Sequence, residues 1–303
     1  MKQVAVVSGK GGTGKTTVAA SLAVLWKQRK ILADCDVDAS NLPLVLRARV
    51  EREEPFIAGK VAEIDPALCR NSGKCFEACR FEAVERTDGS YTINSLACEG
   101  CSVCALVCPQ GAITMHEVES GRLFESSTAY GPMVHAALEP GRENSGKLVT
   151  SVRDTALERA KESDAEIILI DGSPGIGCPV IASLSGASLA LVVVEPTLTG
   201  LQGMERVIAV ARHFGVPCVV CINKADLSPP LSARIEQQCG TPAPGVDSHT
   251  TPVIGKIPFD RAVVEANSRL IPVVESAPSR VTRALEALAA AVLSRLYEGK
   301  GAE

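Results

Sequence analysis

The sequence lacks the features that mark several large classes of protein. Basic residues are not in excess, since 31 Lys and Arg are set against 35 Asp and Glu, and the net charge is -4. That balance argues against non-specific binding to nucleic acid, which depends on neutralising phosphates. No apolar run reaches the roughly 18 residues of a membrane-spanning helix. The N-terminus has neither the hydrophobic core nor the cleavage site of a signal peptide, so we expect a cytoplasmic protein without a membrane span.

Aromatic residues are also scarce, at 3% of the chain, whereas hydrophobic residues make up 46%. This composition favours a core of Ala, Val, Ile and Leu. A chain of 303 residues is long enough to bury a full α/β core and to carry one small additional module.

Short apolar runs alternate with helical patterns over most of the chain. The expected strands are 4–7, 30–33, 167–170, 189–194, 217–222 and 252–257, and the expected helices are 16–27, 145–163, 200–214 and 279–297. The alternation predicts an α/β fold with a mostly parallel, doubly wound sheet and helices on both faces. From about residue 47 to 54 the composition becomes charged and the core pattern stops. We therefore predict one domain from 1–54 and 119–303, interrupted by a cysteine-rich insert at 55–118.

A glycine-rich motif lies between the first expected strand and the first expected helix. The residues Gly9-Lys10-Gly11-Gly12-Thr13-Gly14-Lys15-Thr16 satisfy the pattern G-x-x-x-x-G-K-[ST]. Backbone N–H groups of such a loop cradle phosphate oxygens, and the helix N-terminus adds its dipole. Lys15 would reach the β- and γ-phosphates, and the Thr16 hydroxyl would bind Mg²⁺. Thr17, the next residue, is included in the predicted nucleotide site.

Carboxylates follow two of the expected strands, where ligands bind in open α/β sheets. Asp171 ends the strand 167–170 and is predicted to hold Mg²⁺ through water. Asp34, Asp36 and Asp38 follow the strand 30–33. Among these three we favour Asp36 as the residue that positions or deprotonates the attacking water, and Asp34 and Asp38 are equally well explained as loop carboxylates.

The segment from Lys10 to Thr16 resembles the deviant Walker A motif of the MinD/ParA group of ATPases, which also includes Mrp and the nitrogenase iron protein. The resemblance continues through 34–38, 141–149, 173–179 and 195–197. Members of this group dimerise face to face with nucleotide between them. The resemblance implies an ATP-dependent homodimer, or a heterodimer with a paralogue, in which Lys10 crosses to the partner's phosphates and acts like an arginine finger.

A second motif is a candidate for binding the base of the nucleotide. Asn223-Lys224-Ala225-Asp226 matches the N-K-x-D string with which GTPases hold guanine. ATPases resembling this chain carry similar strings, and the resemblance implies that Asn223 contacts adenine while the loop containing Pro258 lies beside the base. We favour ATP over GTP, with Asn223, Asp226 and Pro258 as base-side residues.

Seven of the twelve cysteines crowd into residues 69–108, and in a cytoplasmic chain such cysteines favour metal ligands over disulfides. The run Cys98-x2-Cys101-x2-Cys104-x3-Cys108-Pro109 is the bacterial ferredoxin pattern, in which the fourth cysteine reaches across to the other cluster. By that crossover, one [4Fe–4S] cluster would bind Cys79, Cys98, Cys101 and Cys104. A structural zinc site is the alternative explanation.

The first half of this insert departs from the pattern. In register, Cys69-x2-Ser72-x2-Cys75-x3-Cys79 has serine where the second cysteine belongs, so the other cluster would have Cys69, Cys75 and Cys108 as thiolate ligands. Three arrangements are open: Ser72 is a ligand as an alkoxide, the cluster is [3Fe–4S], or one iron is open to an external ligand. The sequence thus predicts ATP, Mg²⁺ and one or two iron–sulfur clusters as cofactors.

The remaining cysteines carry weaker signals. Cys178 lies seven residues after Asp171, the spacing at which the nitrogenase iron protein holds a cluster shared across its dimer. The second cysteine that such a cluster needs is missing near residue 143, so we do not expect a bridging cluster. Cys218 and Cys221 lie three apart on an expected strand, where their side chains point to opposite faces, and we interpret them as core residues.

Three functions follow from these motifs. The first is an ATPase that couples nucleotide hydrolysis to electron transfer through ferredoxin-type clusters. The alternative is an ATP-dependent assembly or carrier protein for iron–sulfur or other metal clusters. A positioning switch of the MinD or ParA type ranks third, because the apolar stripe of the last expected helix is better explained by core packing than by membrane binding. A redox or metal-cluster client protein is the expected partner.

Overall fold

The computed structural model describes residues 1–142, 146–240 and 251–298. Contacts divide the chain into two compact units, here called the nucleotide unit and the cysteine unit. The nucleotide unit consists of Met1–Glu53, Leu123–Ala137 and Asn144–Glu303. The cysteine unit consists of Glu54–Arg122 and Leu138–Glu143. Of the segment 141–149 used above for the family resemblance, residues 143–145 lie outside the described residues.

The sheet is mostly parallel and its strands follow a doubly wound order. Within the described residues it has nine strands in the order β11-β10-β9-β1-β8-β2-β7-β6-β3. Parallel pairs run from β11 across to β7. The strands of this parallel part are β1 Lys2–Ser8, β2 Lys30–Asp34, β7 Gly131–Leu138, β8 Ile167–Pro174, β9 Leu189–Val194, β10 Cys218–Asn223 and β11 Val253–Ile257. This arrangement confirms the predicted fold class, and it brings the carboxyl ends of β1, β2 and β8 together.

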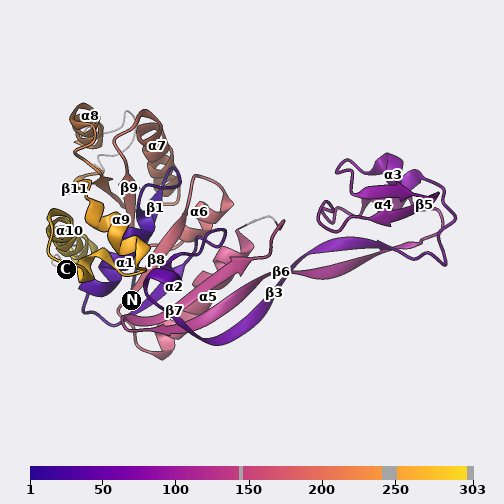
Figure 1. Cartoon of the computed structure of the whole chain (residues 1–303), viewed down its shortest axis with the longest axis horizontal. Helices are drawn as coiled ribbons and strands as arrows, with labels where there is room; N and C mark the ends of the chain where they lie inside the picture. The colour runs from indigo at the N-terminus through magenta and orange to yellow at the C-terminus, as the bar shows by residue number, and fades with distance from the viewer. Residues whose placement is uncertain (143–145, 241–250, 299–303) are drawn as a thin grey trace. The chain divides into compact units, whose positions relative to one another are not determined.

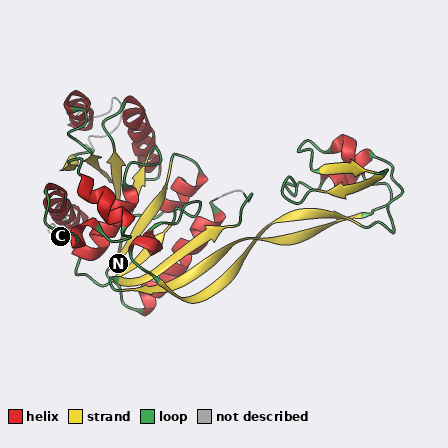
Figure 2. Ribbon diagram, viewed as in Figure 1, coloured by secondary structure: helices red, strands yellow, loops and turns green. Residues whose placement is uncertain are grey.

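Helices cover both faces of the parallel strands (Figures 1 and 2). On one face α1 packs against α10 and the short η1, and on the other α5 packs against α6, which also contacts α7. The helical elements of this unit are α1 Lys15–Leu25, α2 Leu42–Val45, α5 Lys147–Glu162, α6 Cys178–Leu184, α7 Leu198–His213, α8 Pro229–Gly240, α9 Arg261–Ser268, η1 Val273–Glu275 and α10 Arg280–Tyr297. The expected helices therefore form with ends that shift by one or two residues.

The core of the nucleotide unit is aliphatic, as the composition suggests. Val4 to Val7 of β1 are completely buried, because helices cover both faces of this strand. Trp26, the single tryptophan, is buried and donates its indole N–H to the carbonyl of Ala289 at 3.1 Å. The apolar stripe of α10 is buried too, at Leu285, Leu288, Val292 and Leu296. Core packing therefore accounts for that stripe.

Two long strands were not expected from the sequence. They are β3 Arg49–Ile64 and β6 Ile113–Thr128, and each contributes residues to both units. The first part of β3 is exposed along seven consecutive residues, so it has no alternating apolar face that sequence analysis detects. Only two residues join β6 to β7, which fits an antiparallel hairpin.

The cysteine unit is small. It holds two short helices that pack together, α3 Lys74–Ala78 and α4 Val103–Val107, and an antiparallel hairpin of β4 Val84–Thr87 and β5 Ser90–Ile93. Among its described residues, the cluster of buried apolar side chains has four members, Ala62, Cys75, Val84 and Ile113. Cysteines Cys79, Cys98, Cys104 and Cys108 pack around that cluster.

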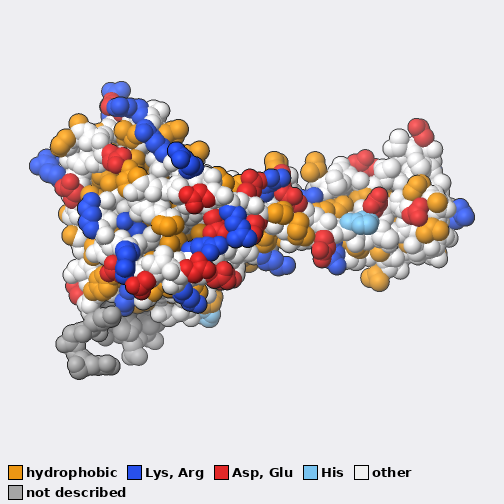
Figure 3. Space-filling model, turned by 90° about the horizontal axis from the view of Figure 1, so that it is seen from below, with side chains coloured by type: hydrophobic (Ala, Val, Ile, Leu, Met, Phe, Trp, Pro, Cys, Tyr) orange, Lys and Arg blue, Asp and Glu red, His pale blue; other side chains and the backbone are white. Residues whose placement is uncertain are grey.

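No helix among the described residues has the length and apolar character needed to cross a bilayer. On the face drawn in Figure 3, acidic and basic side chains are interspersed over the nucleotide unit.

Candidate functional site

The glycine-rich loop leaves β1 at Ser8 and enters α1 at Lys15. The Ser8 hydroxyl donates to the Lys10 carbonyl at 2.6 Å and closes the first turn of the loop. Gly12 and Gly14 have φ of 77° and 93°, a conformation that favours glycine. The N–H of Val18 then bonds the Gly14 carbonyl at 3.0 Å, so the helix starts directly behind the loop. All predicted phosphate-binding residues, from Gly9 to Thr17, therefore lie in the loop or in the first turn of α1.

Close packing explains two of the glycines. A Cβ atom at Gly9 would lie 2.2 Å from the backbone of Gly203 on α7, and one at Gly14 would lie 2.3 Å from the Asn223 side chain. The Asn223 amide donates to the Thr13 carbonyl at 2.7 Å. These contacts hold the loop against α7 and against the last residue of β10.

Two carboxylates meet the loop from neighbouring strands, one from within β8 and one from the turn after β2. Asp171 of β8 is completely buried, and Asp36 follows β2 with a carboxylate oxygen 3.9 Å from the Lys15 ammonium nitrogen. The Lys15 side chain is only 5% exposed, which is rare for a lysine and indicates that the site surrounds it. Burial raises the pKa of Asp36, and the Lys15 charge partly offsets that rise.

Asp171 has the character of a metal-binding carboxylate. Neither of its buried oxygens makes a hydrogen bond of normal geometry within the described residues. Burial raises the pKa of Asp171, and the nearby Thr16 hydroxyl and Lys15 charge partly counter that rise. A buried carboxylate without a full set of partners is costly unless a cation joins it. The oxygen donors of Thr16 and Asp171 therefore fit Mg²⁺, which prefers such ligands.

Asp34 has a structural role instead. It is completely buried, and its carboxylate accepts hydrogen bonds from the Asp36 N–H at 3.0 Å, the Ser40 hydroxyl at 2.9 Å and the Leu42 N–H at 3.1 Å. Burial and then the Asp171 charge raise the pKa of Asp34. These bonds shape the turn that carries Asp36, while Asp38 is exposed.

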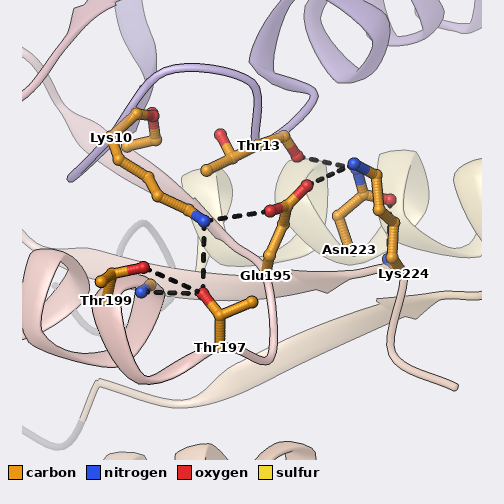
Figure 4. A network of polar contacts seen from close by, with 9 residues as sticks. Lys10, Thr13, Glu195, Thr197, Thr199, Asn223 and Lys224 are labelled. Atoms are coloured by element: carbon orange, nitrogen blue, oxygen red, sulfur yellow. Dashed lines mark hydrogen bonds and ion pairs between the residues drawn. The ribbon is translucent and has the colours of Figure 1, made fainter. Parts of the chain in front are cut away.

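Lys10 is held inside its own chain (Figure 4). Its ammonium nitrogen lies 3.2 Å from a carboxylate oxygen of Glu195 and donates to the Thr197 hydroxyl at 3.2 Å. The other Glu195 oxygen pairs with Lys224. Burial alone would raise the pKa of Glu195, but the hydrogen bonds and charges of Lys224 and Lys10 outweigh it, and the net effect lowers that pKa.

The sequence motifs did not predict a role for Glu195. Glu195 follows β9, which lies beside β1 in the sheet, so its side chain reaches the loop although it is far away in the sequence. The available signal was its position directly after a strand that precedes a helix, which is where ligand-binding residues gather in such sheets.

A cavity of about 210 Å³ lies beside the loop. Gly12, Gly14, Thr17, Asn223 and Pro258 are among the residues that line it. Asp226, the last residue of the N-K-x-D string, is exposed, and its carboxylate accepts a 2.6 Å hydrogen bond from the Phe259 N–H. The cavity suits a nucleobase, whereas Asp226 braces the 257–260 loop beside it.

Seven cysteines of the cysteine unit divide between two small cavities. One is lined by Cys79, Cys98, Cys101 and Cys104. The other is lined by Cys69, Cys75 and Cys108, together with Ser72. The two sets are those that the ferredoxin crossover predicts, because Cys79 and Cys108 each directly follow the helix of one half and line the cavity of the other.

The donor sets fit iron–sulfur clusters. Burial raises the pKa of Cys75 and of Cys104, and neighbouring thiols add to it: Cys69 and Cys108 around Cys75, and Cys98 and Cys101 around Cys104. Cysteines crowded in this way gain most from a cationic metal cluster that stabilises their thiolate forms. In the described residues, no three His, Cys, Asp or Glu side chains converge as a single zinc ion would require.

The other cysteines lie apart from these cavities. Cys178 is exposed and begins α6. Cys218 and Cys221 are buried on β10, and burial raises the pKa of both thiols to about 12. They are core residues, as their strand position suggests.

Comparison with known proteins agrees with this geometry. Residues 4–273 match the CobQ/CobB/MinD/ParA nucleotide binding domain. An uncharacterised protein of Methanocaldococcus jannaschii is 36% identical over 228 residues, which cover 75% of this chain and 79% of that protein. An iron-sulfur cluster carrier protein of Pyrococcus horikoshii is 24% identical over 316 residues, covering 99% and 88% respectively.

Among solved structures, the cell division ATPase MinD of Pyrococcus furiosus superposes with a TM-score of 0.56 at 20% identity, covering 97% of this chain and 99% of that one. This likeness concerns the fold. The family match over residues 4–273 shows that the chain belongs to the CobQ/CobB/MinD/ParA family of nucleotide-binding proteins.

Proposed function

We propose that this protein is an ATP-dependent carrier or assembly factor for iron–sulfur clusters. ATP binding and hydrolysis in the nucleotide unit would time the release of a cluster from the cysteine unit to a client protein. The observation that carries the proposal is the pair of cysteine-lined cavities in a chain that also has a complete phosphate-binding loop. The likeness to an iron-sulfur cluster carrier protein over nearly the whole chain supports it.

The roles of the nucleotide-site residues follow from their positions. Backbone N–H groups from Gly9 to Thr17 would hold the phosphates, with Lys15 neutralising their charge. Thr16 and Asp171 would hold Mg²⁺, which supplies charge neutralisation at the transferred phosphoryl group. Asp36 would orient the attacking water, because its carboxylate faces Lys15 across 3.9 Å. The base would occupy the cavity beside Asn223 and Pro258.

Lys10 would act on the phosphates of a partner subunit, either a second copy of this chain or a paralogue. The contact of Lys10 with Glu195 must then break when the dimer forms. Such a change gives nucleotide binding a defined effect on the protein, since a ligand shifts an equilibrium only through contacts that differ between its states.

In the cysteine unit, Cys79, Cys98, Cys101 and Cys104 would bind one cluster. Cys69, Cys75 and Cys108 would bind the other. A cavity with three thiols favours a cluster that can be released, because each missing ligand removes one of the bonds that retain it.

ATP-gated electron transfer is a second candidate. The cavity with four cysteines is the observation that favours it, since complete thiolate ligation retains a cluster and suits repeated electron transfer.

A transfer assay tests the proposal. Anaerobically reconstituted protein is mixed with a cluster-free ferredoxin, and the cluster gained by the acceptor is followed by circular dichroism with Mg-ATP, Mg-ADP or no nucleotide. We expect Mg-ATP to accelerate transfer and the Asp171→Asn variant to lose that acceleration. Absence of transfer, combined with a nucleotide-dependent change in cluster reduction potential, would contradict the carrier function and favour electron transfer.

A further inference from the structure

The two halves of the cysteine unit share one backbone conformation around the second ligand position. In one half Gly100 and Ser102 flank Cys101 with φ of 64° and 65°. In the other half Asn71 and Gly73 flank Ser72 with φ of 55° and 77°. One left-handed residue on each side of a residue that is not itself left-handed is an unusual combination where non-glycine residues such as Asn71 and Ser102 take part. Its occurrence twice indicates that both loops are built to the same plan.

The helices that follow keep the same register. The Glu77 N–H bonds the Gly73 carbonyl at 3.1 Å, and the Leu106 N–H bonds the Ser102 carbonyl at 3.1 Å. The last turns match as well, since Cys79 and Cys108 each donate a 3.4 Å backbone bond to the residue three positions earlier. Ser72 therefore stands in the place that Cys101 occupies in the other half.

Both residues line a cavity, and both are exposed to solvent. Cys101 completes a set of four thiols, whereas Ser72 faces Cys69, Cys75 and Cys108. The other polar side chains on that wall are those of Tyr91 and Gln110. Among the residues that line this cavity, none offers a thiolate or a carboxylate in place of the missing cysteine.

Serine is a poor substitute here for two reasons. Iron in these clusters favours soft thiolate ligands, and an alcohol must lose a proton that it holds far more tightly than a thiol does. An oxygen ligand also binds closer to a metal than sulfur, by about 0.2 Å in the case of zinc. The Ser72 backbone would have to move inward to compensate.

Contacts on both sides hold this backbone in place. The Asn71 N–H donates to the Cys69 sulfur at 3.4 Å. On the other side, a Cβ at Gly73 would come within 2.9 Å of the Tyr91 hydroxyl, so Gly73 already packs tightly against a residue that lines the same cavity.

We propose that the iron facing Ser72 has no ligand from the protein, is open to solvent, and is the iron at which an external thiolate, such as a client cysteine, binds. The proposal rests on the proposed function in assuming that the cysteine unit holds clusters, and it goes further by identifying one cluster and one iron as the exchangeable ones.

Iron release by a mild oxidant tests this inference without any transfer assay. Ferricyanide removes one electron from [4Fe–4S]²⁺, and an iron without a protein ligand leaves as Fe²⁺, so that [3Fe–4S]⁺ remains. Electron paramagnetic resonance detects the product, and a colorimetric chelator measures the iron released from anaerobically purified full-length protein. We expect one iron per chain to leave rapidly and a [3Fe–4S]⁺ signal to appear.

Three variants identify the iron. Ser72→Cys should supply the fourth thiolate and suppress both signals. Ser72→Ala should behave like the wild type, because the hydroxyl is not a ligand. Cys101→Ser makes the same exchange in the matching loop and should create a second iron of this kind.

Some results would overturn the proposal. If Ser72→Ala alters the wild-type spectrum or the rate of iron loss, Ser72 is a ligand. If Ser72→Cys releases iron as readily as the wild type, the exchangeable iron lies elsewhere. The two proposals fail separately: expected iron release without any transfer to an acceptor would leave this inference standing and contradict the carrier function.

Discussion

The nucleotide unit and the cysteine unit are stabilised in different ways. The nucleotide unit has a large aliphatic core beneath its glycine loop, with Val4 to Val7 and most of β8 and β9 completely buried. Its loop packs closely against Gly203 and accepts a hydrogen bond from Asn223. The packed cluster of buried apolar residues in the cysteine unit has four members among the described residues, and several of the side chains around it are the proposed cluster ligands.

This difference suggests that the nucleotide unit folds without its ligand, whereas the cysteine unit needs its clusters in order to fold. Small units rarely bury enough apolar surface to fold alone, and many obtain the missing stability from a metal. In such cases the free energy of metal binding is also free energy of folding. We therefore expect the cysteine unit to depend on its clusters and the nucleotide unit to be independent of nucleotide.

Cluster removal should give the largest effect. Protein stripped of iron by a chelator under reducing conditions should lose hydrogen-exchange protection throughout α3, α4 and the β4–β5 hairpin, while β1, β8 and β9 keep theirs. Mass spectrometry of peptic peptides resolves the two units in one sample. Full retention of protection in the cysteine unit would show that its small apolar cluster is enough to keep it folded without the clusters.

Replacement of Lys15 should disable the nucleotide unit alone. Lys15→Ala removes the cation that faces Asp36 and the phosphate site, so we expect kcat for ATP hydrolysis to fall by about 10²–10³-fold. Iron content should not change. Lys161→Ala, an exposed lysine on α5, is the matched control and should retain activity. A parallel loss of iron in Lys15→Ala would show that the two units depend on each other for folding.

A buried histidine gives the nucleotide unit a pH dependence of its own. His135 on β7 stacks on Phe124 and hydrogen-bonds the Ser126 hydroxyl at 2.9 Å. Burial lowers the pKa of His135 to about 4. The folded protein therefore binds fewer protons than the unfolded chain between that value and the ordinary histidine pKa. This contribution to stability is complete above about pH 6.5 and is lost as the pH falls toward 4.

Urea unfolding followed by Trp26 fluorescence measures this effect, because Trp26 lies in the core of the nucleotide unit. Between pH 7 and pH 5 the wild type should lose about 2 kcal/mol more than His135→Phe. His213→Gln changes an exposed histidine and should follow the wild type. Equal pH dependence in wild type and His135→Phe would assign the acid sensitivity to other groups.

The sequence predicted the strands and helices of the nucleotide unit better than it predicted β3 and β6, the two strands shared by both units. The expected strand 189–194 coincides with β9, and the expected helix 279–297 differs from α10 by one residue, because continuous apolar runs and a helical stripe leave a clear pattern. The long strands β3 and β6 were missed. Much of β3 is charged and exposed. It forms through backbone pairing in the sheet, so its side chains show no periodic pattern from which a strand could be predicted.

The site shows the same division. The phosphate loop and the ferredoxin spacing are local patterns, and the structure gathers each set of residues in one place. Glu195 escaped prediction because its contact with Lys10 exists only once β9 lies beside β1. A contact made by sheet order cannot be found from spacing along the chain.

Replacement of Glu195 should have the smallest effect. It tests whether the nucleotide unit, unlike the cysteine unit, has its site formed before any partner binds. In the proposed dimer Lys10 would reach the phosphates of a partner, so its contact with Glu195 would have to be lost on dimerisation. Glu195→Gln should weaken that contact. Because Lys10 is 31% exposed, the ion pair contributes little, and we expect nucleotide-dependent dimerisation to strengthen by only about 2- to 5-fold.

Sedimentation velocity with a non-hydrolysable ATP analogue measures the dimer dissociation constant. Glu162→Gln removes an equal charge from an exposed ion pair on α5 and controls for the altered net charge. If Glu195→Gln instead weakens the dimer, Glu195 positions Lys10 for its partner, and the contact seen here is preparation for dimerisation. If neither variant changes the dissociation constant, the contact between Lys10 and Glu195 does not affect dimerisation. Lys10 would then be as available to a partner with the contact as without it.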